Sequence, residues 1–448
     1  MNTSFDINYI LLQIFIFLAI AIYLFRKCSK YNQKAPFDDI GVIWIFVLFL
    51  YSAAPALSFY FQDGVYLTWL SGRLFSLQPT ISQTMDLLNI SICYALGFTV
   101  VYIGLRKKIK PLVFSKIDII SDKVLISASV LFLISKISVT LLYFSGLIGA
   151  ADTYIEEYRV INEAPTLVKQ FLKIVGASGN ICYLIVVVGL FQRWPRTRFA
   201  VLILLLITFI SFNPDGSRTS IVMNLFAMIV SWHVYVKKIK TWIWVLFCTV
   251  SLMVFTVLGA LRGVEEITND KVSDSFKGLG EFEAIWSNGV QMIQEKSKNN
   301  LTVPFDVRFS EFWQFIPSQL LPFEKSSLSV WYVKKYYPSF QEAGGGWAFG
   351  SVAQSALGGG YMEALFRGMA LALLYHIIFK FYRNRPQVWW SYPFYLQILI
   401  FSYQSIRDTT FSQLTEIFQI LLPTIVTVWV VSLVFEWRTN QTAESRLI

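Results

Sequence analysis

The sequence predicts an all-α fold, a polytopic integral membrane helical bundle of about 11 transmembrane helices. Hydrophobic residues make up 55% of the 448 positions, whereas charged residues make up 15%. Apolar segments long enough to cross a bilayer recur along the whole chain, with no internal repeat and no appended soluble domain. Basic residues fall in every second connection between these segments, which is the pattern of cytoplasmic loops. We therefore expect a single membrane domain over residues 1–448.

The boundaries of the predicted spans follow the apolar segments. The sixth span is short and the tenth contains Pro393, so either could be tilted or bent. No Lys or Arg precedes the first span, which predicts a retained span with its N-terminus outside rather than a cleaved signal peptide. The C-terminus is then cytoplasmic. The spans cover residues 9–25, 40–61, 87–105, 124–147, 167–190, 199–212, 220–236, 241–260, 361–381, 388–404 and 413–435.

Charge, cysteine and histidine content exclude several functional classes. The formal net charge of +10 resides mostly in the cytoplasmic loops, so it does not predict a nucleic-acid partner. The 4 cysteines have neither disulfide nor metal spacing, and neither His233 nor His376 has a nearby His or Cys partner. We therefore expect no metal and no cofactor, and we interpret both histidines as structural.

One connection, residues 262–346, is far longer than an ordinary loop and is predicted to form a large periplasmic loop. Apolar residues at helical spacing between Phe276 and Ile293 predict an amphipathic helix. The Trp, Tyr and Phe residues that follow are interrupted by prolines, which predicts short helices on the outer membrane face. These aromatic rings form either an interfacial belt or stacking surfaces for sugars.

Five arginines fall on the outer face, against the bias that keeps basic residues in the cytoplasm. They are Arg159, Arg218, Arg262, Arg308 and Arg407. A guanidinium is a permanently charged planar fork that binds phosphate in a bidentate manner. Several of them at one membrane surface therefore predict a site for a lipid diphosphate. The alternative is that they pair with neighbouring acids or bind ordinary phospholipid headgroups.

Two glycine clusters, residues 344–346 and 358–360, flank a segment that is too short to span the membrane. Such clusters allow the backbone to approach a ligand or another helix closely. The segment between them is either re-entrant or part of a tight helix-packing interface. In the spans, Lys136 is expected to pair or to face a cavity, and Glu363 and Glu416 could be acids, bases or arginine partners.

In the order of its features, the chain resembles the oligosaccharide repeat-unit polymerases of bacterial surface polysaccharides, the O-antigen polymerase or Wzy type. The resemblance covers the C-terminal half well and the N-terminal spans only as topology. Gln354 stands where many relatives have an acid, so an acid from that segment is not expected to act as base. The resemblance is carried by the turn of residues 216–218, by residues 315–317 and 321–322 of the outer loop, by the run of residues 344–351, and by Arg407 and Asp408 before the last span.

The resemblance implies processive glycosyl transfer at the periplasmic face of the bacterial inner membrane. A growing glycan on undecaprenyl diphosphate would be moved onto the sugar of a newly delivered lipid-linked repeat unit. Membrane lipid and a chain-length regulator protein are the further partners expected. Arg218, Arg262 and Arg407 would be diphosphate ligands, and Asp408 a base or the orienter of an arginine. Further substrate contacts are expected from Arg159, Arg308, Lys325, Gly345, Gly346, Ser351 and Gln354.

Other functions remain open beside the polymerase. An O-antigen ligase performs the same class of chemistry, but that group uses a histidine in its large outer loop, and residues 262–346 contain none. A lipid-linked oligosaccharide flippase commonly shows repeated halves and charges near the membrane midplane, whereas this chain has one midplane lysine, Lys136, and no visible repeat. A purely structural scaffold is the remaining alternative. The polymerase is therefore the preferred hypothesis.

Reporter fusions test the predicted orientation. Fusions at residues 30, 115, 195, 238 and 384 are expected to report the cytoplasm, because basic residues cluster in those connections. Fusions at residues 75, 155, 290 and 340 are expected to report the periplasm. Alkaline phosphatase and β-galactosidase activities distinguish the two compartments. A cytoplasmic signal at residue 290 would overturn the functional hypothesis, since the outer arginines would then face the wrong compartment.

Overall fold

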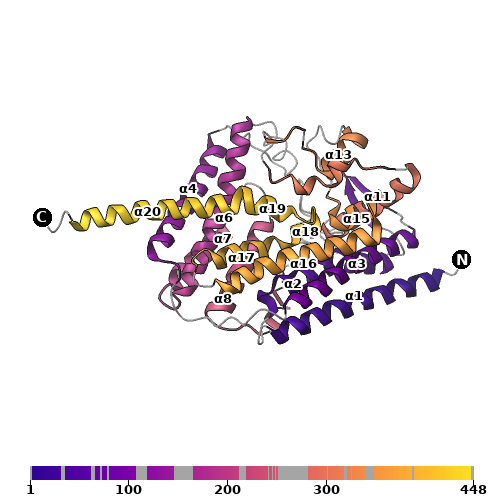
Figure 1. Ribbon diagram of the computed structural model, residues 1–448, viewed down its shortest axis with the longest axis horizontal. Helices are drawn as coiled ribbons and strands as arrows, with labels where there is room; N and C mark the ends of the chain where they lie inside the picture. Colours follow the sequence, from indigo (N-terminus) through magenta and orange to yellow (C-terminus); the bar gives the residue numbers. More distant parts are fainter. Residues whose placement is uncertain are drawn as a thin grey trace. The chain divides into compact units, whose positions relative to one another are not determined.

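The computed structural model is predominantly helical (Figure 1). Its helices divide into two compact units, which are described separately. Unit 1 comprises Met1–Pro111, Cys248–Lys380 and Phe401–Gln413, and unit 2 comprises Leu112–Phe247, Phe381–Ile400 and Leu414–Ile448. The structure describes all residues except 1–2, 32–35, 62–65, 71–72, 78–79, 107–118, 146–164, 211–217, 241, 245, 248, 251–280, 300, 317–319, 324, 339–347, 386–387 and 445–448.

Within the described residues, 7 helices are long and apolar enough to cross a membrane. This confirms a multi-pass helical membrane protein, whereas the predicted count of spans stays a prediction. A further helix, α7 (Arg198–Ile210), is apolar but short, as expected for the sixth span. The 7 segments are Asn8–Tyr31, Ile40–Tyr60, Ile81–Arg106, Asp122–Leu142, Gln170–Gln192, Gly360–Asn384 and Ser412–Glu436.

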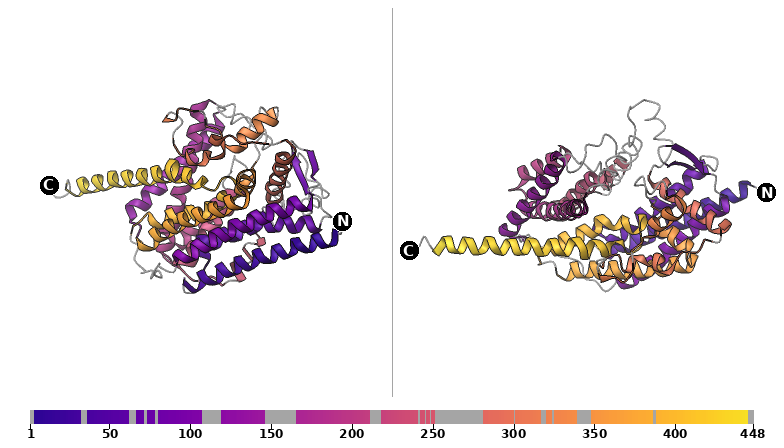
Figure 2. Two further views of the ribbon diagram at one scale, coloured as in Figure 1. Left: turned by 45° about the vertical axis from the view of Figure 1, so that its right-hand side comes forward. Right: turned by 90° about the horizontal axis from the view of Figure 1, so that it is seen from above.

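Unit 1 combines long apolar helices with short helices from the predicted outer loop. The long helices α1, α2 and α3 pack against one another and lie side by side (Figures 1 and 2). The elements of unit 1 are α1 (Thr3–Tyr31), η1 (Pro36–Asp38), α2 (Ile40–Phe61), β1 (Tyr66–Leu70), β2 (Arg73–Leu77), α3 (Ile81–Arg106), α11 (Glu281–Asn299), α12 (Phe305–Arg308), η2 (Ser310–Phe312), α13 (Leu328–Tyr336), α15 (Gly350–Leu357), most of α16 (Gly360–Asn384), η4 (Phe401–Tyr403) and α18 (Gln404–Arg407).

The helices α3 and α16 meet backbone to backbone through two glycines. A Cβ added to Gly97 of α3 would collide with the carbonyl oxygen of Leu365 on α16. A Cβ added to Gly368 of α16 would collide in turn with the carbonyl oxygen of Tyr94 on α3. Small residues permit this spacing because no side chain has to fit between the two backbones. The contact sets where the first turns of α16 lie in unit 1.

A buried ion pair joins the start of α2 to the end of α3. Arg106 donates to Asp39 Oδ2 from Nε at 3.1 Å and from Nη2 at 3.0 Å. The Oδ1 atom accepts from the Tyr102 hydroxyl at 2.7 Å and from the Gly41 backbone N–H at 3.0 Å, so Asp39 also caps α2. A buried pair of this kind is tolerated because its polar atoms find partners.

The strands β1 and β2 depart from the prediction of an all-helical chain. They form an antiparallel hairpin in which Leu70 pairs with Arg73 and Tyr66 pairs with Leu77. Hydropathy missed the hairpin because ten residues between two spans carry too little apolar signal. The pair Ser71–Gly72, which lies outside the described residues, is a two-residue turn sequence that could have indicated it.

Unit 2 is organised around α6. This helix packs against α4, α8 and α17, and α20 packs against α4. Polar contacts reinforce these pairs, for example Ser135 Oγ to the Val175 carbonyl at 2.7 Å and Tyr183 to Thr208 at 3.0 Å. The elements are α4 (Asp122–Phe144), α6 (Thr166–Gln192), α7, α8 (Arg218–Tyr235), α17 (Ser391–Ile400), the π-helical turn η5 (Ile417–Leu421) and α20 (Leu422–Glu444), while α19 (Ser412–Glu416) has residues in both units.

The irregularity of the tenth predicted span does not lie at Pro393. This proline occupies the first turn of α17, where no backbone hydrogen bond is lost. Regular α-helix ends instead at Ile400, and the short η4 and α18 follow. These two short helices lead to Asp408, which belongs to the site described below.

Alanine at Gly97 tests the contact between α3 and α16. Gly97→Ala should lower the midpoint of thermal unfolding in detergent, because overpacking costs about 1–3 kcal/mol and the obstacle here is backbone. Gly104→Ala in the same helix is the matched control, since nothing lies within 4 Å of a Cβ added there. Equal midpoints for the two variants would contradict the close glycine contact.

Candidate functional site

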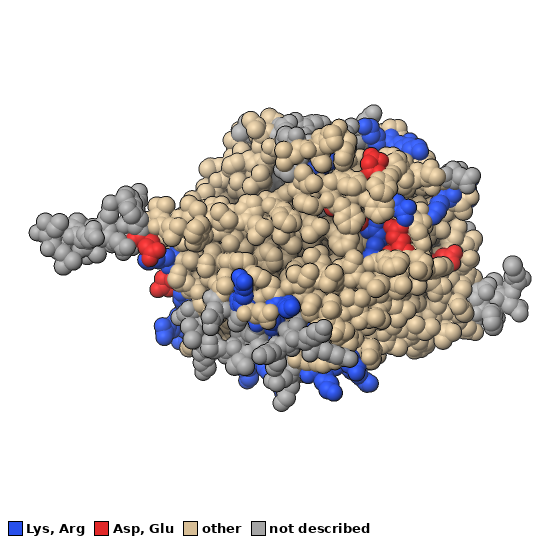
Figure 3. Space-filling model, in the orientation of Figure 1, with Lys and Arg blue, Asp and Glu red and all other residues tan. Residues whose placement is uncertain are grey.

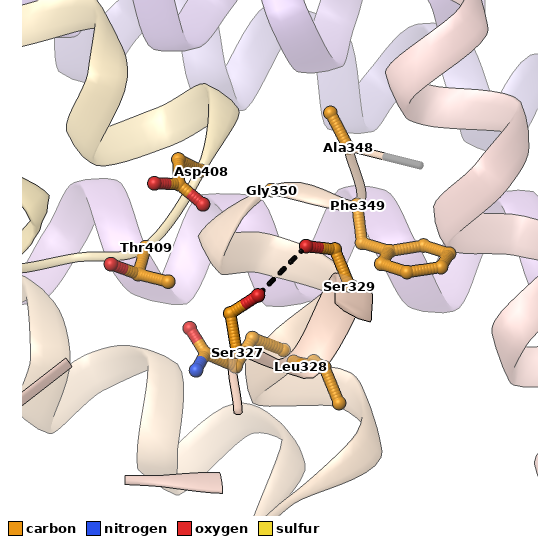
Figure 4. A pocket seen from close by; sticks show the side chains of 9 residues that line it. Ser327, Leu328, Ser329, Ala348, Phe349, Gly350, Asp408 and Thr409 are labelled. Atoms are coloured by element: carbon orange, nitrogen blue, oxygen red, sulfur yellow. Dashed lines mark hydrogen bonds between the residues drawn. The ribbon is translucent and has the colours of Figure 1, made fainter. Parts of the chain in front are cut away.

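A polar pocket in unit 1 is the candidate functional site (Figure 4). It holds about 280 Å³ of empty space, part of it open to solvent. Its enclosed free volume is only about 20 Å³, room for a water molecule or two, so a larger ligand would extend into solvent or require the surrounding residues to move. Three segments far apart in sequence line it, with Ser327, Leu328, Ser329, Ala348, Phe349, Gly350, Gln354, Asp408 and Thr409.

Hydroxyl groups face a carboxylate across the pocket. Figure 4 shows Ser327 and Ser329, whose hydroxyls lie 3.1 Å apart, opposite Asp408 and Thr409. Ser327 also caps α13, because its Oγ accepts the backbone N–H of Val330 at 3.3 Å. Hydroxyls and carboxylates bind hydroxyl-bearing ligands well, since each can accept a hydrogen bond and the hydroxyls can also donate one.

Asp408 follows the last residue of α18 and is open to the pocket. Asp408 is exposed to solvent at the pocket. Surrounding protein nevertheless raises the pKa of its carboxyl by partial desolvation, and the adjacent Arg407 offsets part of that rise. A carboxylate with a raised pKa is a stronger base than an ordinary aspartate. Asp408 is therefore suited to accept a proton from a ligand hydroxyl.

The short helix α15 forms the floor of the site and is buried along its whole length. It begins at Gly350, whose φ of +77° lies in the left-handed region that favours glycine. A Cβ at this position would lie 2.6 Å from the Ile406 carbonyl oxygen, so glycine also allows α15 to approach α18. Gln354 is thereby placed at the pocket, where its Nε2 donates to the Arg308 carbonyl oxygen at 3.1 Å.

An arginine–glutamate network, formed by Arg308, Glu311, Glu363 and Arg367, adjoins this floor. Arg367 donates from Nε to Glu363 Oε1 at 2.9 Å and from Nη1 to Glu311 Oε1. Arg308 donates from Nη2 to Glu363 Oε2. Arg367 and Glu311 are almost fully buried, at 7% and 0% exposure, so this pair is desolvated. Burial raises the pKa of Glu311, although Arg367 counteracts the rise.

The network also holds the segment that carries the pocket's carboxylate. Arg367 Nη1 donates to Thr410 Oγ1 at 3.1 Å, and the backbone N–H of Phe411 donates to Glu311 Oε2 at 3.3 Å. The Tyr94 hydroxyl of α3 donates to the same Thr410 oxygen at 3.3 Å. Asp408 and Thr409 are therefore positioned by residues directly after them.

A further cation, Lys296 of α11, binds the end of α15. Its Nζ donates to the carbonyl oxygens of Ala356 and Leu357, both at 2.9 Å. These carbonyls have no helical partner, and a cation there also complements the helix dipole. Partial burial lowers the pKa of Lys296, and nearby Arg308 lowers it further. In Figure 3, basic and acidic surfaces adjoin where Figure 1 draws α11 and α15.

The aromatic residues of the outer loop fall into two groups. Tyr332 and Phe349 belong to a hydrophobic cluster beside the pocket, with ring centroids 5.0 Å apart. The Tyr332 hydroxyl also donates to Glu295. Phe305 and Phe312 are exposed. The first pair thus contributes to the core of this region. The second pair packs on Phe309 and Phe411 and leaves part of each ring exposed.

The predicted site residues are only partly brought together. Asp408 and Gln354 line one pocket, Arg308 is joined to Gln354, and Ser351 is buried in α15. Lys325 donates instead to the carbonyl oxygens of Gln314 and Ile316, which is a structural contact within the loop. Arg407 ends α18, and Arg218 is the first residue of α8, with a side chain that is not described. Arg159, Arg262, Gly345 and Gly346 lie outside the described residues.

Sequence reasoning missed Arg367, Glu311 and Lys296. The available signal for Arg367 was its position inside a predicted span, four residues after Glu363, where a charged pair calls for explanation. Glu363 is a partner of two arginines, one of the roles considered for it. Glu416, the other acid considered, accepts a hydrogen bond from Gln397 at 2.8 Å in unit 2.

Comparisons with protein-family models, with curated proteins and with solved structures find no match to this chain. Among the residues that the structure describes, no group of three or more His, Cys, Asp or Glu side chains is arranged to hold a metal ion. The side chains themselves are therefore the basis for assigning a function.

Breaking the buried pair tests whether it anchors the outer loop. Arg367→Met leaves the Glu311 carboxylate buried without its partner, which costs about 3–5 kcal/mol. Thermal unfolding should occur at a lower temperature, and limited trypsin digestion within residues 301–337 should be faster. The double variant Arg367→Met/Glu311→Gln should recover part of the loss.

The control is Glu436→Gln, which removes the exposed pair with Lys123. Exposed pairs contribute roughly 0–1 kcal/mol, so this variant should resemble the wild type. If Arg367→Met were as stable and as protease-resistant as Glu436→Gln, the anchoring role would be wrong.

Proposed function

We propose that this protein is a polysaccharide polymerase that joins polyprenyl-diphosphate-linked oligosaccharide repeat units at the periplasmic face of the inner membrane. The product would be an O-antigen, a capsule or a similar polymer. One observation carries the proposal. Three segments of the resemblance, namely the outer loop, the glycine-flanked segment and the residues after Arg407, line one polar pocket. Its hydroxyl, amide and carboxylate groups suit the hydroxyls of a sugar.

The proposed reaction breaks the bond between the anomeric carbon of the growing glycan and its diphosphate. A hydroxyl oxygen of the incoming repeat unit forms the new bond and loses its proton. Negative charge grows on the departing diphosphate while the sugar passes through an oxocarbenium-like state. Fixed cations stabilise this charge where it develops. Arg218, Arg262 and Arg407 are proposed as diphosphate ligands, with Arg159 and Arg308 as secondary contacts.

Asp408 is proposed as the base that accepts the proton of the acceptor hydroxyl. Its carboxylate is open to the pocket, and its pKa is raised by desolvation. Ser327, Ser329 and Gln354 are proposed to orient the acceptor sugar from the other walls. Lys325 is kept among the proposed substrate contacts, although its ammonium donates to loop carbonyls in this structure.

The proposal also includes the number of spans and their orientation in the membrane. We propose about 11 spans, with the N-terminus in the periplasm and the C-terminus in the cytoplasm. Residues 262–346 would then form a periplasmic loop, and the polyprenyl carrier would lie in the surrounding lipid. A chain-length regulator is proposed as a protein partner. Deletion of the gene distinguishes the rivals: loss of a polymerase leaves single capped repeat units, whereas loss of a flippase or ligase leaves none on the surface.

Lysine substitutions test the diphosphate ligands. Arg218→Lys, Arg262→Lys and Arg407→Lys should each slow polymerisation of purified lipid-linked repeat unit, since lysine keeps the charge but loses the planar fork. A charge-assisted hydrogen bond contributes roughly 1.5–3 kcal/mol, which corresponds to about ten- to hundredfold in rate. Glycan length on gels and the initial rate are the measurements.

Arg438→Lys, on the proposed cytoplasmic side, is the matched control and should polymerise at the wild-type rate. Activity should also persist in excess chelator, because arginines rather than a divalent ion neutralise the diphosphate. Wild-type rates from all three outer variants would mean that these arginines only contact lipid headgroups. Loss of activity in chelator with recovery in magnesium would refute the metal-independent mechanism.

A further inference from the structure

Three donors converge on the carboxylate of Glu363, in the first turn of α16. Its Oε2 accepts a hydrogen bond from the backbone N–H of Gly359 at 2.6 Å and another from Nη2 of Arg308. Its Oε1 accepts a hydrogen bond from Nε of Arg367 at 2.9 Å. Two guanidinium groups and a backbone N–H at the start of a long helix are the donor set with which proteins bind phosphoryl groups. Here an internal carboxylate occupies the position of the anion.

Glycines at the start of α16 allow the backbone to lie close to Glu363 and Arg308. A Cβ added to Gly358 would collide with both the Glu363 carboxylate and the Arg308 guanidinium. Gly360 has a φ of +62°, a left-handed conformation that lets the chain turn into α16. Glycine at position 358 thus keeps a side chain away from Arg308 and Glu363, whereas glycine at position 360 serves the backbone conformation alone.

The two arginines hold donors that the network leaves unused. Arg367 Nη2 and Arg308 Nε are buried and make no hydrogen bond within the described part of the chain. Arg367 is itself only 7% exposed. A buried guanidinium N–H without an acceptor is costly, so an additional acceptor at this place would be stabilising. Arg308 is 33% exposed, which gives a ligand access to the cluster from solvent.

We propose that Arg308, Arg367 and the Gly359 backbone N–H form a phosphoryl-binding site, and that Glu363 occupies it until a ligand displaces the carboxylate. Glu311 stays on Arg367 during the exchange, because it also holds the Phe411 backbone and is fully buried. This inference rests on the proposed function for its biological ligand, the lipid diphosphate. The site itself requires only a phosphoryl group, from a lipid carrier, a phospholipid headgroup or free pyrophosphate.

The proposal predicts that removing the charge of Glu363 strengthens ligand binding. The full-length protein in detergent is titrated with inorganic pyrophosphate and with farnesyl diphosphate by isothermal calorimetry. Glu363→Gln should bind both roughly ten- to hundredfold more tightly than the wild type, because the competing charge-assisted contacts are lost. Glu295→Gln is the matched control: Glu295 accepts from Tyr332 and Tyr337 but contacts neither arginine, so its affinity should be unchanged.

Two further variants keep the test decisive if Glu363→Gln misfolds. Glu363→Asp retains the charge on a side chain one methylene shorter, so it should give a smaller increase in affinity. Arg308→Ala should abolish binding in the wild type and in either Glu363 variant. Unchanged or weaker pyrophosphate binding in the Glu363 variants would overturn the proposal, as would an absence of binding in every variant.

The source of the phosphoryl group follows from competition. Phosphatidylglycerol micelles that displace pyrophosphate from Glu363→Gln would identify a headgroup site, whereas preferential displacement by farnesyl diphosphate would identify a carrier site. The two proposals also fail separately. Tighter binding by Glu363→Gln without glycan polymerisation by the wild type would refute the polymerase but keep the anion site. Polymerisation with unchanged pyrophosphate affinity in Glu363→Gln would refute the anion site alone.

Discussion

Two carboxylates held between two guanidinium groups are the constraint on which unit 1 depends. Arg308 and Glu311 belong to the outer loop, whereas Glu363 and Arg367 belong to α16. The pairs Glu311–Arg367 and Arg308–Glu363 therefore tie the loop to a long apolar helix. Glu311 and Arg367 are almost fully buried, so losing one of them would leave the other charge buried without its partner. The loop therefore has a fixed place at α16 in spite of its length.

The short helix α15 and two glycines with positive φ values also determine the shape of the site. The short helix α15 has too few residues to be stable by itself. Its stability comes from burial and from Lys296, which binds the carbonyl oxygens at its C-terminal end. Gly350 at its start and Gly360 shortly after it both take positive φ values. Residues that avoid this conformation could not make the two turns, and Gln354 would not reach the pocket.

Hydropathy and charge were sufficient to predict the helical character and most of the long spans, because lipid requires every backbone group to be satisfied within the helix. The family resemblance, rather than hydropathy, placed Asp408 and Gln354 among the candidate site residues, and the structure shows both at one pocket. Arg367 was missed because the arginines singled out from the sequence lie at the outer ends of spans or in outer loops. Arg367 lies several residues inside its span. Glu311 meets Arg367 across 56 positions of sequence, and no local pattern encodes such a contact. The hairpin β1–β2 was missed because each of its strands is too short to give a clear hydropathy signal.

The crossing of α3 and α16 at Gly97 and Gly368 has a mechanical consequence. Helices separated by a layer of side chains can slide by rotamer changes, whereas two backbones in contact have no such compliant layer between them. The two helices are therefore expected to move together as one rigid pair. A displacement of the first turns of α16 would then carry with it the outer loop that Arg308 and Glu311 hold to this helix.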